Sequence, residues 1–170
     1  MVKIGVIGGG QLARMMIPAA INLGFDVRVF AEATGSSAGL AVTTIGDYTN
    51  AAEVLKFASE VDVLTFDHEH VPTAILEAVR DDGVSVYPSP EALRLTHNKI
   101  EMRRRLQKIG SPQPRWAVVE PGASREIAAD AVGGFPCVAK KPIGGYDGKG
   151  VRVISSWDDI ADWLAEGPVL

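Results

Sequence analysis

Three consecutive glycines, Gly8-Gly9-Gly10, stand between an apolar segment and a segment with helical periodicity, where they could bind a phosphate group. Glycines let the backbone approach a phosphate closely, and the first N–H groups of a helix donate hydrogen bonds to its oxygens. With Gln11-Leu12-Ala13 the turn fits the pattern G-x-G-x-x-G/A of dinucleotide-binding proteins. Glu32 follows the next apolar segment, where such proteins place the acid that binds a ribose hydroxyl. A tight strand-to-helix turn without a ligand is the alternative interpretation.

A second polar cluster, Asp67-His68-Glu69-His70, follows the apolar segment 61–66. In open α/β sheets, ligands bind at the carboxyl ends of the strands, so these side chains are well placed for binding. Alternation along an extended segment sends the carboxylates to one side and the imidazoles to the other, which leaves no compact set of metal ligands. We therefore predict that Glu69 accepts a hydrogen bond from a substrate hydroxyl or amine. A histidine, His68 or His70, is expected to cap the next helix.

The third candidate is the segment 140–150, which combines four glycines and three lysines between two apolar segments. Glycine N–H groups can surround phosphate oxygens, and Lys140, held on a strand, can neutralise their charge. The segment does not match the Walker pattern G-x-x-x-x-G-K-[ST], and a strand rather than a helix follows it. A hairpin turn would explain one or two of the glycines but not four. The composition thus predicts a flexible, cationic loop that closes over a polyphosphate.

Strands and helices alternate through roughly the first 90 residues and predict a parallel sheet covered on both faces. Strands are expected at 2–7, 27–30, 41–45, 61–66 and 84–87, and helices at 11–23, 50–59 and 72–80. Beyond them we expect one long helix at 91–109, strands at 116–119, 135–140 and 151–154, and helices at 124–132 and 157–165. The strands that flank the glycines are close enough to pair as a hairpin. Residues 168–170 resemble the start of another strand. The predicted domains are 1–96 and 97–170.

The composition is typical of a globular protein without a general affinity for nucleic acid. Of 170 residues, 46% are hydrophobic and 22% are charged, and 17 basic against 21 acidic side chains give a net charge of −4. The single cysteine, Cys137, cannot form an internal disulfide and is expected to be a small core residue. No apolar run is long enough to span a membrane, and the start at Met1 lacks a signal-peptide pattern. We therefore expect a cytoplasmic protein.

Three segments, in this order, resemble the N5-carboxyaminoimidazole ribonucleotide synthetases, a family of ATP-grasp ligases of purine biosynthesis. They are Ile7-Gly8-Gly9-Gly10-Gln11-Leu12-Ala13-Arg14-Met15, Thr65-Phe66-Asp67-His68-Glu69-His70-Val71-Pro72 and Gly144-Gly145-Tyr146-Asp147-Gly148-Lys149-Gly150. The resemblance covers essentially the whole chain. It implies an α/β fold in which a parallel, Rossmann-like pre-ATP-grasp sheet is followed by the first, incomplete part of an ATP-grasp domain. Such synthetases are longer, so the chain is expected to be an amino-terminal half that is inactive alone.

The resemblance implies the reaction and assigns the binding residues. ATP would phosphorylate bicarbonate to carboxyphosphate, and the amine of aminoimidazole ribonucleotide would capture the carboxyl group or the CO2 that carboxyphosphate releases. Aminoimidazole ribonucleotide would be bound by Gly10, Gln11, Leu12 and Glu69. ATP would be bound by Lys99, Lys140, Gly145, Tyr146, Asp147, Gly148, Lys149, Gly150 and Val151. No catalytic residue is assigned, and the ligands of Mg²⁺ are expected beyond residue 170.

The sequence differs from the family pattern at two places, and two other functional classes stay open. His97-Asn98 stands where the family usually has Gln-Asp, and Val151 where many members have Gln. The amino-terminal NAD-binding domain of an oxidoreductase would explain the first glycines and Glu32, but not the second glycine segment. A non-catalytic nucleotide-binding module is the third class. The expected partners are small molecules, namely aminoimidazole ribonucleotide, bicarbonate and ATP, rather than nucleic acid or a membrane, and a homodimer is left open.

Overall fold

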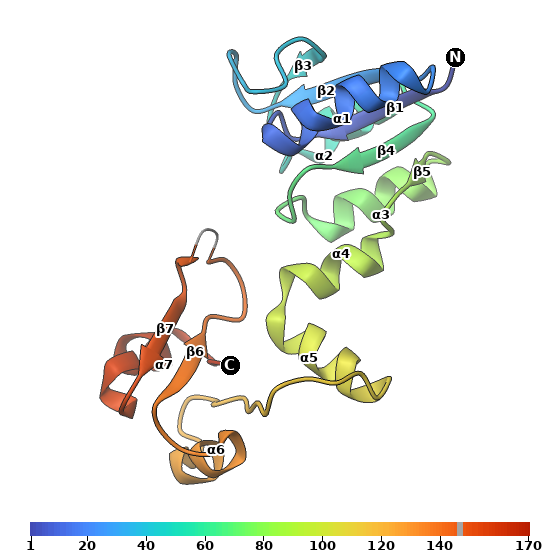
Figure 1. Cartoon of the computed structure of the whole chain (residues 1–170). Coiled ribbons are helices and arrows are strands. Elements are labelled where there is room, and N and C mark those ends of the chain that lie inside the picture. The colour runs from blue at the N-terminus through green and yellow to red at the C-terminus, as the bar shows by residue number, and fades with distance from the viewer. Residues whose placement is uncertain (146–147) are drawn as a thin grey trace. The chain divides into compact units, whose positions relative to one another are not determined.

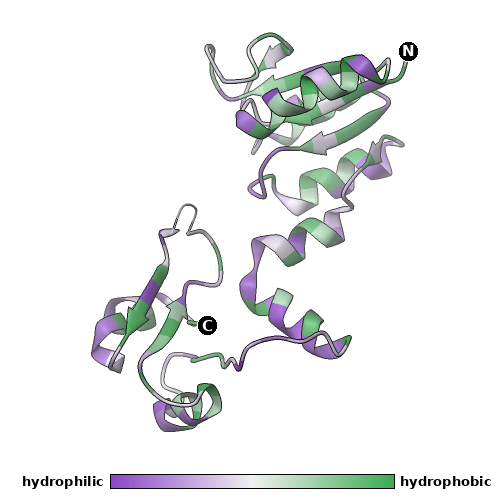
Figure 2. Ribbon diagram, viewed as in Figure 1, coloured by the Kyte–Doolittle hydropathy of each residue, from purple (hydrophilic) through white to green (hydrophobic). Residues whose placement is uncertain are grey.

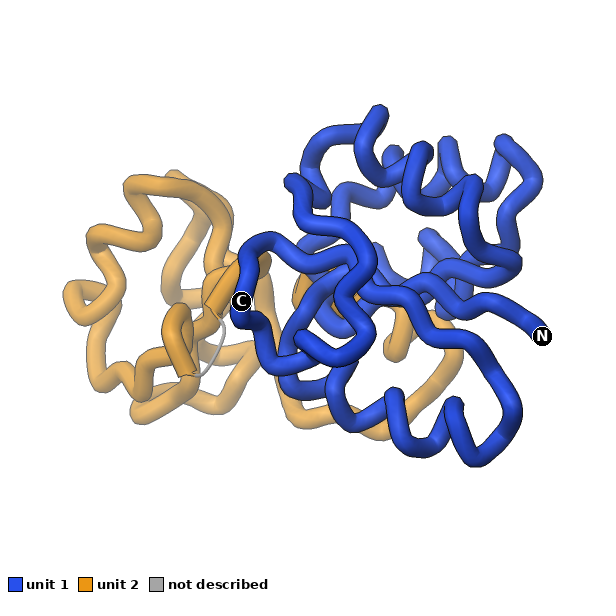
Figure 3. The backbone as a smooth tube through the Cα atoms, turned by 90° about the horizontal axis from the view of Figure 1, so that it is seen from above, with its two compact units in different colours: residues 1–94 blue, residues 95–170 orange. Residues whose placement is uncertain are grey.

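The computed structural model describes residues 1–145 and 148–170 and divides into two compact units (Figure 1). Unit 1 comprises Met1–Arg94 and unit 2 comprises Leu95–Leu170; Figure 3 colours them blue and orange. The sequence predicts a domain boundary between residues 96 and 97. The two units are described separately below.

Unit 1 is built on a five-stranded parallel sheet with the strand order β3-β2-β1-β4-β5, which confirms the predicted fold class. The strands are β1 (Lys3–Ile7), β2 (Asp26–Ala31), β3 (Val42–Ile45), β4 (Val63–Phe66) and β5 (Ser85–Val86). The helices are α1 (Gln11–Asn22), α2 (Ala51–Ala58), α3 (Thr73–Asp81) and α4 (Pro90–His97), the last of which runs on into unit 2. The strand order reverses between β1 and β4, because the chain passes from β1 to β2 and β3 on one side and returns to β4 on the other.

Both faces of this sheet are covered by apolar packing, as a parallel sheet requires. Val6 and Val29 point to one face, where they pack in a cluster with Ala13 of α1. The neighbouring residues Ile7 and Phe30 point to the opposite face and pack against α2 and α3. Figure 2 shows β1 and β4 in largely hydrophobic colours. The continuous apolar character of these strands therefore follows from burial on two sides.

Unit 2 contains a two-stranded antiparallel hairpin, which confirms the predicted pairing around the glycine segment. Its elements are α5 (Lys99–Lys108), α6 (Arg125–Val132), β6 (Cys137–Lys140), β7 (Val151–Ile154), the 3-10 helix η2 (Trp157–Ile160) and α7 (Ala161–Glu166). Residues 168–170 lie between residue 119 and β6, because Val169 forms an antiparallel bridge with Val119 and Leu170 exchanges two backbone hydrogen bonds with Lys140. The strand predicted at 116–119 is therefore wrong apart from this single bridge.

The prediction of a single helix over 91–109 is also wrong, because the helix is interrupted at Asn98. The backbone of Asn98 is extended (φ −115°, ψ 109°), and its side chain accepts hydrogen bonds from the N–H groups of Ile100 at 3.0 Å and Glu101 at 3.2 Å. An asparagine in this position is a helix N-cap, which ends α4 and begins α5. Similarly, the helix predicted for 157–165 divides into η2 and α7, and η2 begins with a capping box formed by Ser156 and Asp159.

Replacing Asn98 by alanine is expected to lower the free energy of unfolding of unit 2 by about 1 kcal/mol, because two helix N–H groups lose their acceptor. All three tryptophans, Trp116, Trp157 and Trp163, belong to unit 2, so urea denaturation followed by tryptophan fluorescence reports on it. Asn98→Asp keeps an acceptor oxygen and serves as the control. An equal loss in both variants would contradict the capping role.

Candidate functional site

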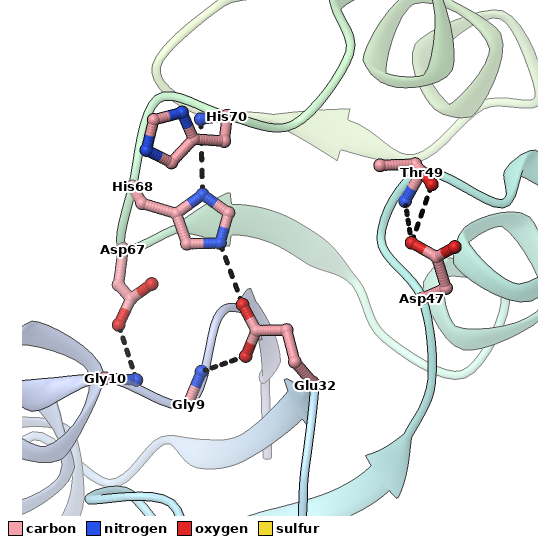
Figure 4. A network of polar contacts seen from close by, with 8 residues as sticks. All are labelled: Gly9, Gly10, Glu32, Asp47, Thr49, Asp67, His68 and His70. Carbon is pink, nitrogen blue, oxygen red and sulfur yellow. Dashed lines mark hydrogen bonds and ion pairs between the residues drawn. The ribbon is translucent and has the colours of Figure 1, made fainter. Parts of the chain in front are cut away.

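Three of the sequence candidates meet at one edge of the unit 1 sheet. The glycine turn, residues 8–10, follows β1, Glu32 follows β2, and the polar segment, residues 67–70, follows β4 (Figure 4). In open α/β sheets, ligands bind outside the carboxyl ends of the strands at the point where the strand order reverses, which here lies between β1 and β4. The edge between the glycine turn and the polar segment is therefore the candidate site of unit 1.

The carboxylate of Asp67 holds the glycine turn from the neighbouring strand. The N–H group of Gly10 donates to Oδ2 of Asp67 at 2.8 Å, and the N–H group of Asp67 donates to the carbonyl of Ile7 at 2.9 Å. A Cβ atom on Gly8 would overlap Oδ1 of Asp67, and one on Gly10 would lie 2.6 Å from Oδ2. Gly8 also has φ +103°, a conformation that side chains disfavour. Two of the three glycines are thus required by the approach of this carboxylate.

Glu32 contacts the same turn from the other side and pairs with His68. Its Oε2 atom accepts a long hydrogen bond of 3.5 Å from the N–H group of Gly9, and its Oε1 atom lies 3.2 Å from Nε2 of His68. Nδ1 of His68 accepts from the N–H group of His70 at 3.2 Å, so the tautomer that satisfies both contacts carries its proton on Nε2. The predicted capping of α3 by a histidine is wrong, because Pro72 is the N-cap and no side chain caps it.

These contacts change the interpretation of the glycine turn. The sequence predicts that the N–H groups of the glycine turn and of the helix start bind a phosphate, but those of Gly9 and Gly10 already donate to carboxylates. The N–H groups of Gln11 and Leu12 begin α1 and have no partner within the helix. Leu12 has 56% of its surface exposed. Glu69 lies half-buried in the turn between β4 and α3. The carboxylates of Glu32 and Asp67 therefore occupy the N–H groups of Gly9 and Gly10 but not those of Gln11 and Leu12.

In unit 2, the hairpin presents an apolar face that includes Lys140. Val138 and Val153 are directly opposite one another and are 52% and 75% exposed, and the next pair on the same face of the hairpin is Lys140 with Val151. Because side chains alternate along a strand, Lys140 lies on the same face as Val138, whereas Ala139 belongs to the buried core. This face can contact a flat apolar group and a negative charge at the same time.

A cavity of about 380 Å³ adjoins Lys140 within unit 2. This volume lies within the usual range of small-molecule sites. Basic and apolar side chains line it together; they are Arg103, Pro114, Arg115, Trp116, Ala117, Val132, Pro136, Cys137, Val138, Lys140 and Leu170. Burial raises the pKa of the Cys137 thiol above its usual range, which disfavours the reactive thiolate. Cys137 is therefore a wall residue rather than a candidate nucleophile.

The glycine loop, residues 142–150, is closed at its base by backbone contacts. The N–H group of Lys141 donates to the carbonyl of Gly150 at 2.9 Å, and a Cβ atom on Gly145 would overlap the carbonyl oxygen of Lys149. Gly144, Gly145, Gly148 and Gly150 all have positive φ. Lys99 donates from Nζ to the carbonyl of Gly144 at 2.8 Å. Tyr146 and Asp147 lie outside the described residues. The glycine content is thus required by the backbone of the loop.

Lys141 and Arg152 lie around the Trp163 ring rather than toward the apolar face. The Arg152 guanidinium lies 4.2 Å from the centroid of the Trp163 ring and makes two hydrogen bonds to Asp162, at 2.7 and 2.8 Å. Lys141 pairs with Glu166 and lies 5.5 Å from the same centroid. Of the two adjacent lysines, Lys140 therefore shares the face of Val138, whereas Lys141 lies beside Trp163 and Glu166.

Within residues 1–145 and 148–170, no group of three or more His, Cys, Asp or Glu side chains is placed to hold a metal ion. In the same part of the chain, no helix combines the length and the apolar character needed to cross a membrane.

A parallel sheet with a glycine turn at its reversal point, followed by a hairpin with a lysine-containing glycine loop, defines the amino-terminal part of an ATP-grasp ligase. The family model described as the ribonucleotide synthetase preATP-grasp domain matches residues 1–97, and the ATP-grasp domain model matches residues 104–168. The chain belongs to the N5-carboxyaminoimidazole ribonucleotide synthetase family. The oxidoreductase alternative is not favoured by these matches.

Curated relatives and solved structures agree on this family. The chain is 41% identical over 165 residues to the N5-carboxyaminoimidazole ribonucleotide synthase of Mycobacterium tuberculosis, with 96% of this chain and 38% of the relative covered. It is 45% identical over 150 residues to the enzyme of Corynebacterium ammoniagenes, with coverage of 87% and 36%. The synthetase structure from Thermotoga maritima superimposes with a TM-score of 0.82 at 29% identity, with coverage of 99% and 45%. The chain thus spans less than half the length of these relatives.

Proposed function

We propose that this chain contributes two substrate sites to the ATP-dependent carboxylation of 5-aminoimidazole ribonucleotide with bicarbonate. The observation that supports the proposal is that one chain contains both candidate sites. Unit 1 has the sheet edge with Gln11, Leu12 and Glu69, and unit 2 has the hairpin face with Lys140 beside the glycine loop. A related synthetase structure from Aspergillus clavatus, 29% identical with a TM-score of 0.76, is described as a complex with ADP and 5-aminoimidazole ribonucleotide, and this chain covers 46% of it. The lone cysteine suits the reducing cytoplasm, where we place this reaction.

The edge of unit 1 suits the aminoimidazole and ribose parts of the nucleotide. Glu69 offers acceptor oxygens to an amine or hydroxyl, while the first N–H groups of α1 offer donors and Leu12 an exposed apolar surface. The carboxylates of Asp67 and Glu32 occupy the N–H groups of the glycine turn and would repel a phosphate there. We therefore place the 5′-phosphate away from Gly9 and Gly10, in contrast to the sequence prediction.

The hairpin face of unit 2 suits ATP. Val138 and Val153 offer an apolar surface for the adenine ring, and Lys140 offers a cation for the phosphates. The N–H groups of the glycine loop, together with Lys149, would cover the triphosphate and exclude water from the reacting atoms. Lys99 would act from the base of the loop, where it already holds the carbonyl of Gly144.

The proposed reaction has two balanced steps. An oxygen of bicarbonate attacks the γ-phosphorus of ATP, the bond to the β-phosphate oxygen breaks, and ADP leaves carboxyphosphate behind. The amine of aminoimidazole ribonucleotide then forms a bond with the carboxyl carbon, loses a proton and displaces phosphate. The residues of this chain bind and orient the two nucleotides. Among the described residues, no group of three or more His, Cys, Asp or Glu side chains is placed to hold Mg²⁺.

The test is phosphate release that depends on aminoimidazole ribonucleotide, measured with ATP and bicarbonate in a polypeptide that has the length of the relatives. Glu69→Gln is expected to raise the KM for aminoimidazole ribonucleotide about tenfold, because a charge-assisted hydrogen bond becomes a neutral one, while the KM for ATP stays unchanged. Glu126→Gln, at an exposed position of α6, is the control. Absence of nucleotide-dependent release in the unsubstituted protein would overturn the proposed function, and an unchanged KM would remove Glu69 from the site.

A further inference from the structure

We propose that Asp67 is a positioning residue, whose carboxylate pins the glycine turn to the polar segment and thereby sets the separation between the first turn of α1 and Glu69. This inference rests on the proposed function for the identity of the ligand. The pin itself depends only on contacts between described residues.

Asp67 makes hydrogen bonds to the end of β1 and to the glycine turn, one through its backbone and one through its side chain. Its N–H group donates to the carbonyl of Ile7, the last residue of β1, at 2.9 Å, and its Oδ2 atom accepts from Gly10, three residues later, at 2.8 Å. These two contacts span the glycine turn from end to end. The turn and the residue that precedes His68 and Glu69 are therefore held at a defined spacing across the strand reversal.

The lack of side chains in the turn makes this approach possible. A Cβ atom on Gly8 would overlap Oδ1 of Asp67, and a Cβ atom on Gly10 would lie 2.6 Å from Oδ2. Both carboxylate oxygens thus face the turn rather than a ligand. Asp67 consequently acts through the turn and not by touching the substrate.

The charge of Asp67 also serves the helix that the turn begins. Gly10 is the N-cap of α1 but has no side chain to act as a cap, and the first turn of α1 contains no acidic residue. A negative charge near a helix N-terminus is favourable, and a hydrogen bond to a carboxylate is about twice as strong as a neutral one. Asp67 supplies that charge from the adjacent strand, 57 residues away in the sequence.

The first experiment separates positioning from general destabilisation. Asp67→Ala is expected to raise the KM for aminoimidazole ribonucleotide about tenfold, to change kcat less than about twofold and to leave the KM for ATP unchanged. Asp67→Asn keeps an acceptor oxygen and should recover most of the lost affinity. Asp82→Ala, at the exposed C-cap of α3, is the matched control. An equal KM in the unsubstituted, Asp67→Ala and Asp67→Asn proteins would overturn the positioning role.

The second experiment needs no substrate. Amide hydrogen exchange of Gly10 in the 170-residue chain is expected to accelerate about tenfold or more in Asp67→Ala and to stay near the original rate in Asp67→Asn. Suppose that phosphate release by the unsubstituted enzyme proves independent of aminoimidazole ribonucleotide while the Gly10 amide still loses exchange protection in Asp67→Ala. That result would overturn the proposed function but support the structural role of the hydrogen bond between Asp67 and Gly10. Unchanged exchange of Gly10 in Asp67→Ala would overturn the pin itself.

A double-substitution cycle tests whether Gly10 and Asp67 act as one unit. Gly10→Ala introduces a Cβ atom against Oδ2 of Asp67 and should raise the same KM. In an Asp67→Ala background that overlap is gone, so Gly10→Ala should add less than about a twofold further increase. Fully multiplicative effects of the two substitutions would contradict the coupling.

Discussion

Lys140→Ala is expected to slow ATP turnover about a hundredfold or more in an enzyme of the relatives' length, because a fixed cation beside the phosphates is lost. Two backbone hydrogen bonds with Leu170, at 2.7 and 3.0 Å, hold the backbone of Lys140 in place. Its side chain emerges from the face that carries Val138 and adjoins the cavity of unit 2. The backbone that carries this side chain is therefore held in place before the substrate arrives.

The measurement is steady-state ATP turnover with aminoimidazole ribonucleotide and bicarbonate at saturation. Lys108→Ala removes an exposed lysine from the last turn of α5 and should change the rate less than about twofold. Equal effects of the two substitutions would show that the hairpin face of unit 2 is not the ATP site.

Gly8→Ala is expected to lower the free energy of unfolding by about 3 kcal/mol, the largest effect on stability that we predict. Two causes act together, because alanine disfavours the φ of +103° and its Cβ atom would overlap Oδ1 of Asp67. Relief of the overlap would require Asp67 to move away from the turn, with loss of its hydrogen bond to Gly10.

Gly24→Ala is the matched control for this prediction. Gly24 has φ +77° and no atom within 4 Å of an added Cβ, so only the backbone strain remains, at about 1 kcal/mol. Urea denaturation followed by far-ultraviolet circular dichroism compares the two variants. If both lose the same stability, the close approach of Asp67 contributes nothing to the cost.

Local patterns were sufficient for most of the elements of unit 1. Asn50, the first residue of the helix predicted for 50–59, accepts from the N–H group of Ala52 and caps α2, which begins at Ala51. Apolar runs placed the strands because burial on both faces demands continuous apolar residues. The break at Asn98 escaped prediction, because helical spacing of apolar residues continues from α4 into α5 and an asparagine inside a helix is not unusual.

For the candidate site, the sequence predicted the location at one edge of the sheet but not the contacts between its side chains. Parallel strands place their carboxyl ends together, so the glycine turn, Glu32 and the polar segment could be expected near one another. The hydrogen bonds of Asp67 to Gly10 and of His68 to Glu32 depend on side chains 57 and 36 residues apart. No periodicity in the sequence encodes such contacts. The one local indication of the contact between Asp67 and the turn was the third glycine, Gly10, because a tight turn alone does not require it.

The position of residues 168–170 between residue 119 and β6 has a consequence for the order of folding during synthesis. Val169 belongs to the buried core of unit 2, and its backbone pairs with Val119, 50 residues earlier. The sheet of unit 2 can be completed only after these residues leave the ribosome, whereas every strand of unit 1 is available by residue 86. Unit 1 should therefore acquire its native contacts first. Residues 111–140 can complete their native contacts only after residues 168–170 have been synthesised.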